Sequence, residues 1–330
     1  MLTVRYPTML LEVNHLKTYF YTRSGPVKAV DDISYDIAPG EIVALVGESG
    51  CGKTVGALSL LRLIPEPPGK IINGEAWFHD RDLLKLSPKE IRQMRGGKIS
   101  MVFQEPMTSL NPVLTVRRQL CEGLVEHQGM DWAQARQESA RLLEIVGIPD
   151  GDRRLDQYPH QFSGGMRQRV MLAIALSCQP SLIIADEPTT AVDVTIQAQL
   201  LELISNLTQE FQVAVLLITH NLGVVAKYAH RVNVMYAGRI VEKGTVHDIF
   251  HRPRHPYTVA LLQSVPRLDW DKSEKLIPIE GQPPDLLRRP PGCAFHPRCN
   301  WAISACHETW PELTQVGDQH WAACDVMPAT

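Results

Sequence analysis

The hydrophobic pattern of the chain is dominated by three short runs of apolar residues, which show no alternation of apolar and polar positions. They are rich in β-branched residues and span residues 42–46, 182–185 and 213–218. Apolar runs of this length are typical of parallel strands that are buried on both faces. A glycine-rich or polar segment follows each run. The pattern therefore predicts an α/β fold whose sheet carries its chemistry at the carboxyl ends of the strands.

Helical patterns separate these runs. Residues 58–63 follow the first run, and residues 197–207 form an amphipathic segment. Apolar residues also recur at helical spacing over 132–146, directly before Gly147, and a glycine is a common helix stop. The stretch from about 106 to 161 is expected to be mostly helical, which predicts a helical subdomain inserted into the sheet.

The composition changes near Arg252. Eleven of the 24 prolines lie beyond this residue, and regular patterning there is sparse apart from residues 257–262. We therefore expect a main domain over residues 8–250 and a loop-rich accessory region over residues 251–330. Something other than a large apolar core is expected to hold that region.

Charge and composition exclude several classes of protein. A chain of 330 residues can bury a large core. Its formal charge of −3 with a pI near 6.5 argues against a protein whose whole surface is built for nucleic acid, and leaves a local basic patch open. The N-terminus has no apolar core of signal-peptide length, and no apolar run reaches the roughly 18 residues of a membrane helix. We expect the protein in the cytosol, with any link to a membrane made through a partner.

The first apolar run leads into a phosphate-binding pattern. Residues 47–54 fit G-x-x-x-x-G-K-[ST] between a predicted strand and a predicted helix. Glycines let backbone N–H groups approach phosphate oxygens, and the helix N-terminus adds positive potential. Lys53 is predicted to reach the β- and γ-phosphates and Thr54 to bind Mg²⁺, while Cys51 fills space. The predicted ATP-binding residues of this loop are Gly47, Ser49, Gly50, Cys51, Gly52, Lys53 and Thr54.

Two adjacent carboxylates, Asp186 and Glu187, end the second apolar run. Such a pair can divide the work, with Asp186 directed toward Mg²⁺ and Glu187 toward the attacking water as polariser or base. An isolated Asp-Glu dipeptide at a strand end is usually solvated surface. The phosphate-binding pattern upstream favours the catalytic interpretation.

The order of the motifs resembles that of the ABC ATPases. The phosphate loop is followed by Gln104, then Ser163-Gly164-Gly165, then Asp186-Glu187, residues 189–193 and Thr219-His220. This series is similar to the Walker A, Q-loop, signature, Walker B, D-loop and H-loop of that family. The resemblance implies a P-loop ABC nucleotide-binding domain with an inserted helical subdomain. It also implies a dimer, because the signature segment of such proteins touches the nucleotide of a second subunit.

The resemblance implies a role for each further residue. Gln104 would sense Mg²⁺ or the γ-phosphate, His220 would contact the γ-phosphate, and Asp193 would bridge the two subunits. An aromatic residue before the phosphate loop would stack on adenine, and Phe20 fits best, although Tyr19 and Tyr21 leave the register open.

The signature departs from its usual form at two positions. Phe162 and Met166 stand where Leu and Gln are usual, and Val192 replaces a common Leu in the D-loop. Because Ser163 and both glycines are retained, we expect function to survive. The sequence does not show what Met166 changes.

Two further segments narrow the resemblance. Residues 104–112 and the Arg-His-Pro-Tyr-Thr segment at 254–258 look like the dipeptide and oligopeptide branch of bacterial ABC importers, to which nickel and glutathione importers also belong. The branch implies a second, related ATPase subunit, two membrane permease subunits and an extracytoplasmic solute-binding protein, on the cytoplasmic face of the membrane. The transported solute stays open between peptide, nickel and glutathione. A non-transport ABC protein is the alternative class, although no heptad run indicates the coiled coils of repair proteins.

Four cysteines crowd the C-terminus with spacings of five, six and seventeen residues: Cys293, Cys299, Cys306 and Cys324. Four thiolates in a loop-rich segment could bind a [4Fe–4S] cluster or Zn²⁺, or could stay unliganded. The spacing lacks the paired C-x-x-C knuckles of zinc ribbons and resembles the iron–sulfur site of some dipeptide-importer ATPases, which favours the cluster. Three nearby histidines, His296, His307 and His320, could substitute as ligands, but we expect them on the surface.

Overall fold

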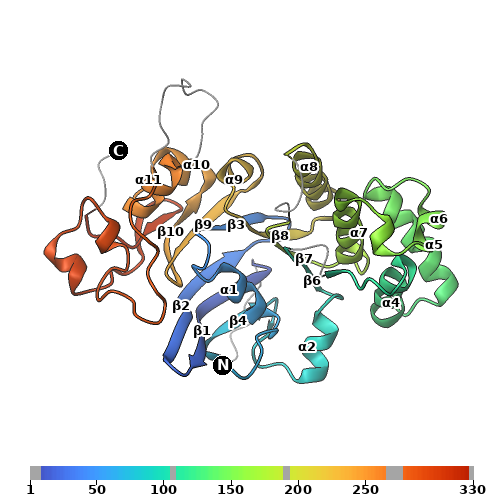
Figure 1. The fold of residues 1–330 in the computed structure, drawn as a ribbon, viewed down its shortest axis with the longest axis horizontal. Helices are drawn as coiled ribbons and strands as arrows, with labels where there is room; N and C mark the ends of the chain where they lie inside the picture. Colours follow the sequence, from blue (N-terminus) through green and yellow to red (C-terminus); the bar gives the residue numbers. More distant parts are fainter. Residues whose placement is uncertain (1–8, 105–108, 189–193, 265–277, 327–330) are drawn as a thin grey trace. The chain divides into compact units, whose positions relative to one another are not determined.

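The computed structural model describes residues 9–104, 109–188, 194–264 and 278–326. The predicted D-loop residue Asp193 lies outside the described residues. Strands and helices alternate along most of the chain, so the predicted α/β fold class is confirmed (Figure 1). Among the described helices, none combines the length and the apolar character needed to cross a membrane.

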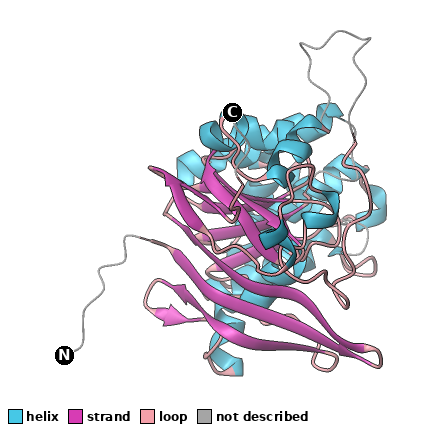
Figure 2. Cartoon of the chain, turned by 90° about the vertical axis from the view of Figure 1, so that its left-hand side faces the viewer, coloured by secondary structure: helices cyan, strands magenta, loops and turns pink. Residues whose placement is uncertain are grey.

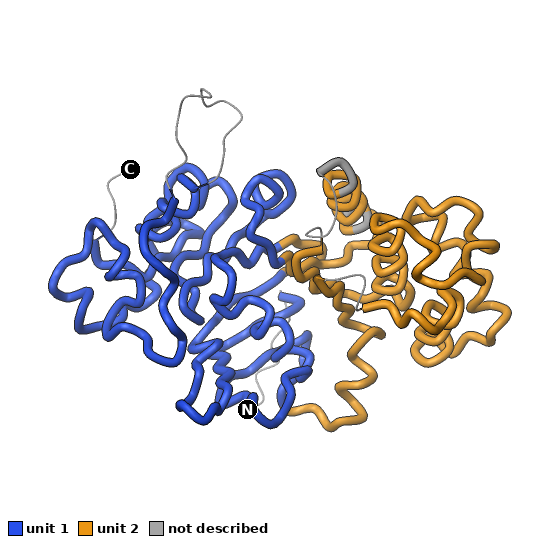
Figure 3. Tube along the Cα trace, viewed as in Figure 1, with its two compact units in different colours: residues 1–37, 43–84, 218–330 blue, residues 38–42, 85–217 orange. Residues whose placement is uncertain are grey.

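The chain divides into two compact units (Figure 3). Unit 1 consists of Met1–Ile37, Val43–Leu84 and Ile218–Thr330, and unit 2 consists of Ala38–Ile42 and Lys85–Leu217. Residues far apart in sequence therefore share unit 1, including the predicted phosphate loop and the whole accessory region.

Unit 1 contains an antiparallel sheet that the hydrophobic pattern does not predict (Figure 2). Leu11, Val13 and Leu16 are buried, but a register shift between Val13 and Leu16 interrupts the alternation that would mark a strand in the sequence. In spatial order the strands are β2 (Gly25–Ile37), β1 (Leu11–Thr22), β4 (Gly69–Phe78) and β5 (Arg81–Asp82).

A second group of strands in unit 1 includes the one that leads to the phosphate loop. This strand, β3, is buried throughout, as predicted, and lies parallel to β9, while the other neighbouring pairs are antiparallel. The order is β11 (Thr314–Gly317), β12 (His320–Ala322), β10 (Arg239–Thr245), β9 (Arg231–Tyr236) and β3 (Ile42–Val46). The end of the accessory region therefore adds a hairpin to this group of strands.

The helices of unit 1 are short. Helix α1 follows the phosphate loop and is tied to β1 by a buried hydrogen bond of 2.8 Å between the hydroxyls of Ser59 and Thr18. The elements are α1 (Lys53–Leu60), α9 (Leu222–Tyr228), α10 (Val246–His251), α11 (Pro256–Gln263) and the 3₁₀ turns η2 (His296–Arg298) and η3 (Ser304–His307).

The accessory region is joined to an apolar core, which corrects the expectation that it lacks one. Tyr257, Ala294 and Phe295 are almost completely buried in a cluster that also contains Tyr236 of β9. Ring centroids lie 4.5 Å apart for Tyr236 and Tyr257 and 5.3 Å apart for Tyr236 and Phe295. Aromatic side chains bury large apolar areas, so three rings can anchor a segment that has little regular structure.

A buried carboxylate, Glu242 of β10, fixes both ends of the accessory region. It accepts hydrogen bonds from the backbone N–H groups of Arg254 (2.6 Å) and His255 (2.9 Å), and His320 Nε2 lies 2.7 Å from its Oε1. A buried charge needs such partners to offset its lost hydration. His320 is therefore not on the surface, contrary to expectation, because it is one of the partners that Glu242 needs.

Unit 2 carries the other two predicted strands and most of the helices. The prediction of a helix over 132–146 is confirmed by α5, which Asp131 begins with a capping box and which ends before Gly147. The strands, in spatial order, are β8 (Ala214–Ile218), β7 (Leu182–Asp186) and β6 (Ile99–Val102). The helical elements are α2 (Pro88–Met94), α4 (Val116–Gln128), α5 (Trp132–Ile145), α6 (Gly151–Leu155), η1 (Pro159–Gln161), α7 (Gly164–Leu176) and α8 (Val194–Phe211).

Candidate functional site

The predicted phosphate loop connects β3 to α1 and is packed too tightly for most side chains. Gly47 and Gly52 have φ angles of 151° and 106°, which side-chain-bearing residues rarely adopt. A Cβ at Gly47 would collide with the carbonyl oxygen of Met235, and one at Gly52 with the carbonyl oxygen of Ala29. Both glycines are therefore required by the packing of unit 1.

Lys53 sits at the centre of the loop. Its ammonium group donates to the carbonyl oxygens of Gly47 (2.8 Å) and Glu48 (3.0 Å), and the side chain is 6% exposed. The same residue begins α1, so a positive charge and the N-terminus of a helix occupy one place. This combination favours the binding of an anion such as a phosphate. Burial raises the pKa of the Cys51 thiol, which fits a space-filling residue rather than a nucleophile.

Two more of the predicted residues belong to unit 1. His220 is exposed and follows Thr219, whose N–H donates to the carbonyl of Leu45 in β3 (3.3 Å). Phe20 is half-buried on β1, opposite Gly69 of β4. The neighbouring Tyr19 instead donates its hydroxyl to Asp31.

The predicted catalytic carboxylates lie in unit 2 at the carboxyl end of β7. Asp186 is buried, and Glu187 is half-buried with a left-handed φ of 46°. Gln104, which follows β6, donates from Nε2 to Oε2 of Glu187 at 3.0 Å. Non-glycine residues in this conformation are uncommon and cluster at functional sites. The structure thus brings two of the predicted catalytic residues, Gln104 and Glu187, together. One of them, Glu187, has an uncommon backbone conformation.

The predicted signature segment forms the start of α7, also in unit 2. Ser163 is the N-cap residue, and its hydroxyl accepts a hydrogen bond from Met166 N–H at 3.3 Å. Phe162 is buried, whereas Ser163 and Gly164 are exposed. A Cβ at Gly164 would meet nothing within 4 Å, so no contact within the described chain requires glycine there. Because Met166 acts here through its backbone, its replacement of Gln leaves this cap intact.

Two residues that hold the predicted phosphate loop do not follow from the sequence. Arg298 forms an ion pair with Glu48 of the loop, and the hydroxyl of Tyr257 accepts a hydrogen bond from Glu48 N–H. Burial alone would lower the pKa of Arg298, but its bonds to Glu48 and Tyr236 outweigh burial and raise it. These residues are separated from Glu48 by 250 and 209 positions, so no local pattern could reveal them.

The four C-terminal cysteines line a single small cavity in unit 1. The N–H of Cys293 donates to the carbonyl of Cys306 at 2.9 Å, which joins two of the predicted ligands through their backbone. Burial, with the neighbouring thiols adding to it, raises the pKa of Cys293 to about 11, and burial also raises that of Cys299. Within the described residues, no three or more His, Cys, Asp or Glu side chains are grouped so that they could hold a metal ion.

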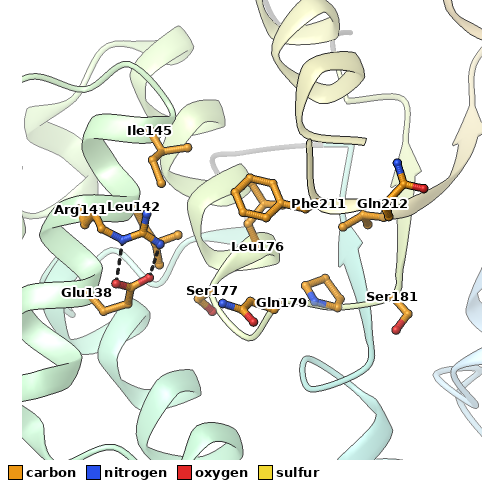
Figure 4. Close-up of a pocket in the computed structure, with 12 residues that line it drawn as sticks. Glu138, Arg141, Leu142, Ile145, Leu176, Ser177, Gln179, Ser181, Phe211 and Gln212 are labelled. Carbon is orange, nitrogen blue, oxygen red and sulfur yellow. Dashed lines mark hydrogen bonds and ion pairs between the residues drawn. The ribbon is translucent and has the colours of Figure 1, made fainter. Parts of the chain in front are cut away.

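A pocket shown in Figure 4 belongs to unit 2. It is lined by residues of α5, the end of α7 and the end of α8, among them Arg141, which pairs with Glu138, and Phe211. Ser181 in its wall directly precedes β7, whereas Glu187 follows that strand. A strand of this length separates its two ends by roughly 15 Å, so the pocket is not part of the catalytic edge.

Comparison with known proteins gives matches over almost the whole chain. Residues 30–190 match the ABC transporter family, and residues 241–306 match the family described as oligopeptide/dipeptide transporter, C-terminal region. The dipeptide transport ATP-binding protein DppD of Bacillus subtilis is 52% identical over 96% of this chain and 94% of its own length. The oligopeptide transport ATP-binding protein AppD of the same organism is 51% identical over 92% of both chains.

A solved structure shows the same fold. It is the dimeric post-hydrolysis state of the ATP-binding cassette MJ0796 bound to ADP and Pi, with a TM-score of 0.64 and 25% identity over 72% of this chain and 98% of that one. With the sequence relatives, this match confirms the resemblance that the motif order indicates. The chain belongs to the ABC transporter ATPases, within the family of dipeptide and oligopeptide transport ATP-binding proteins.

Proposed function

We propose that the chain is the ATPase subunit of a bacterial importer of di- or oligopeptides, bound to the cytoplasmic face of the membrane through permease subunits. The similarity to DppD, which extends through the accessory region, carries this proposal. Nickel and glutathione import are not favoured, because DppD and AppD are named for dipeptide and oligopeptide transport. Residues 8–250 would form the nucleotide-binding domain, with its helical subdomain over about 106–161, and residues 251–330 the accessory region.

The predicted residues would divide the work of ATP hydrolysis. Backbone N–H groups of residues 47–54 and the ammonium of Lys53 would hold the phosphates, while Thr54, Gln104 and Asp186 would hold Mg²⁺. The ion would neutralise charge on the phosphates. Glu187 would orient the attacking water and accept its proton, and its bond from Gln104 supports this role by fixing the carboxylate.

Two residues complete the proposed site from the phosphate side. His220 would contact the γ-phosphate, which is supported by its exposure next to β3, the strand that leads into the loop. Phe20 would stack on adenine. Asp193 would bridge two subunits, although it lies outside the described residues.

The signature segment would serve the nucleotide of a second subunit. The segment presents a surface suited to phosphate at the N-terminus of a 13-residue helix. This surface includes the exposed Ser163 and Gly164, beside which the described chain leaves free space. A Cβ at Gly164 would meet nothing within 4 Å in the described chain, so the space beside this residue could admit a group from a second subunit. The second subunit would be a related but different ATPase. The assembly would also contain two permeases and a solute-binding protein.

The four C-terminal cysteines would hold a [4Fe–4S] cluster. All four cysteines line one small cavity of unit 1, which supports their acting on one bound group. Their spacing lacks the paired C-x-x-C knuckles of zinc ribbons, which favours the cluster over Zn²⁺. The metal would also stabilise the thiolate forms that burial disfavours and would fasten a segment with little regular structure.

Replacing the proposed base should nearly abolish turnover. Glu187→Gln keeps the side-chain size but cannot accept the proton, so ATP hydrolysis by the assembled transporter should fall by at least about 100-fold, with ATP still bound. The measurement is steady-state phosphate release, with Glu202→Gln on α8 as the control. A near-wild-type rate in Glu187→Gln would contradict the assignment of Glu187.

A bulky cation at the signature should damage the opposite site only. Ser163→Arg should lower transporter ATP hydrolysis by at least about tenfold while the isolated chain still binds ATP at its own loop, since that loop lies elsewhere in the chain. Ser24→Arg, at an exposed turn, is the control. If the isolated Ser163→Arg chain loses ATP binding, the cross-subunit role is wrong.

Iron and sulfide should be present in protein purified without oxygen. We expect about four of each per chain. Cys299→Ser should lose most of the iron, whereas Cys178→Ser, a buried cysteine of unit 2, should keep it. Stoichiometric zinc without iron, or the absence of both metals, would refute the cluster.

The purified transporter should contain one copy of this chain and one copy of another ATPase. Native mass spectrometry of the intact membrane complex measures this composition directly. Two copies of this chain and no second ATPase would overturn the proposed heterodimer.

A further inference from the structure

The phosphate loop carries an acidic residue that the accessory region neutralises. Glu48 is the second residue of the loop, and its two carboxylate oxygens face the two terminal nitrogens of Arg298 at 2.7 and 2.9 Å. Such a bidentate pair fixes orientation as well as charge. The Arg298 side chain is only 4% exposed, so water screens the pair weakly.

Arg298 is also held in place by partners other than Glu48. Its Nε donates to the carbonyl of Glu280 at 2.9 Å, and one terminal nitrogen donates to the carbonyl of Ile279 at 3.3 Å. The other donates to the hydroxyl of Tyr236 at 3.3 Å. The guanidinium therefore has partners on all sides and presents a fixed surface to the loop rather than a mobile one.

The backbone of Glu48 is held by the same region. Its N–H donates to the hydroxyl of Tyr257 at 2.8 Å, and Tyr257 is completely buried against Tyr236 and Phe295. The carbonyl of Glu48 accepts from Lys53. The side chain, N–H and carbonyl of one loop residue are thus all engaged, two of them by the accessory region.

The charge of Glu48 has a direct consequence for a bound triphosphate. An unpaired carboxylate in the loop would repel the phosphates and would also attract the Lys53 ammonium away from them. We propose that Arg298 is a positioning residue for ATP: it neutralises Glu48 and, with Tyr257, keeps the loop in its phosphate-binding shape. The inference rests on the proposed assignment of residues 47–54 as the phosphate loop.

Charge compensation separates this role from a merely structural one. In the full-length chain, Arg298→Gln should weaken Mg-ATP binding by about tenfold, which corresponds to ~1.4 kcal/mol. Glu48→Gln should bind within about twofold of wild type, because it removes the repulsive charge itself. The double variant Arg298→Gln with Glu48→Gln should recover most of the lost affinity. In the transporter, Arg298→Gln should raise KM for ATP and change kcat by less than about twofold.

Controls keep the test sharp. Arg231→Gln removes a guanidinium that pairs with Asp36 at 2.7 Å in the same unit but away from the loop, and it should leave ATP affinity unchanged. Arg298→Lys keeps the positive charge but cannot form the bidentate pair, so its affinity for Mg-ATP should lie between those of wild type and Arg298→Gln. If Arg298→Gln does not fold, Arg298→Lys takes its place in the test.

Two results would overturn the inference: wild-type ATP affinity in folded Arg298→Gln, or a double variant that binds as weakly as Arg298→Gln alone. Lys53→Ala tests the underlying assignment separately. If that variant binds ATP normally, residues 47–54 are not the phosphate loop, whatever Arg298 does.

Discussion

The close packing of the predicted phosphate loop, residues 47–54, against carbonyl groups of two distant strands is the constraint on which the rest of unit 1 depends. Gly47 lies against Met235 of β9, and Gly52 lies against Ala29 of β2. The N–H of Gly238, just beyond β9, also donates to the carbonyl of Cys51 at 2.9 Å. The shape of the loop therefore depends on its packing against β9 and β2. Its glycines are needed for this tertiary packing as well as for the local backbone conformation.

The accessory region continues this packing. Tyr236 follows Met235 in the chain and contacts Tyr257 and Phe295, so the rings that anchor the region lie one residue from a contact that shapes the loop. Arg298 then reaches the loop itself. A segment whose composition is typical of an appendage therefore supports the predicted phosphate loop.

The sequence predicts those features that short-range patterns carry. The buried runs at β3, β7 and β8, the helix over 132–146 and the order of the motifs follow from local chemistry, and the structure agrees with them. The antiparallel sheet is not predicted, because a bulge in β1 interrupts the alternation of buried and exposed residues. The sequence also does not predict that Arg298 pairs with Glu48 or that His320 is buried against Glu242, because the partners are far apart in the chain. The left-handed backbone of Glu187 is equally invisible to a motif.

The proposed sharing of the nucleotide site between two subunits is tested most directly by the structure of the assembled transporter carrying Glu187→Gln and bound to ATP. The ATP phosphates should lie on the backbone N–H groups of residues 47–54, with the signature serine of the second ATPase on their far side. Ser163 of this chain should in turn face the nucleotide held by that second subunit. A structure in which Ser163 contacts the nucleotide of its own chain, or none, would contradict the arrangement.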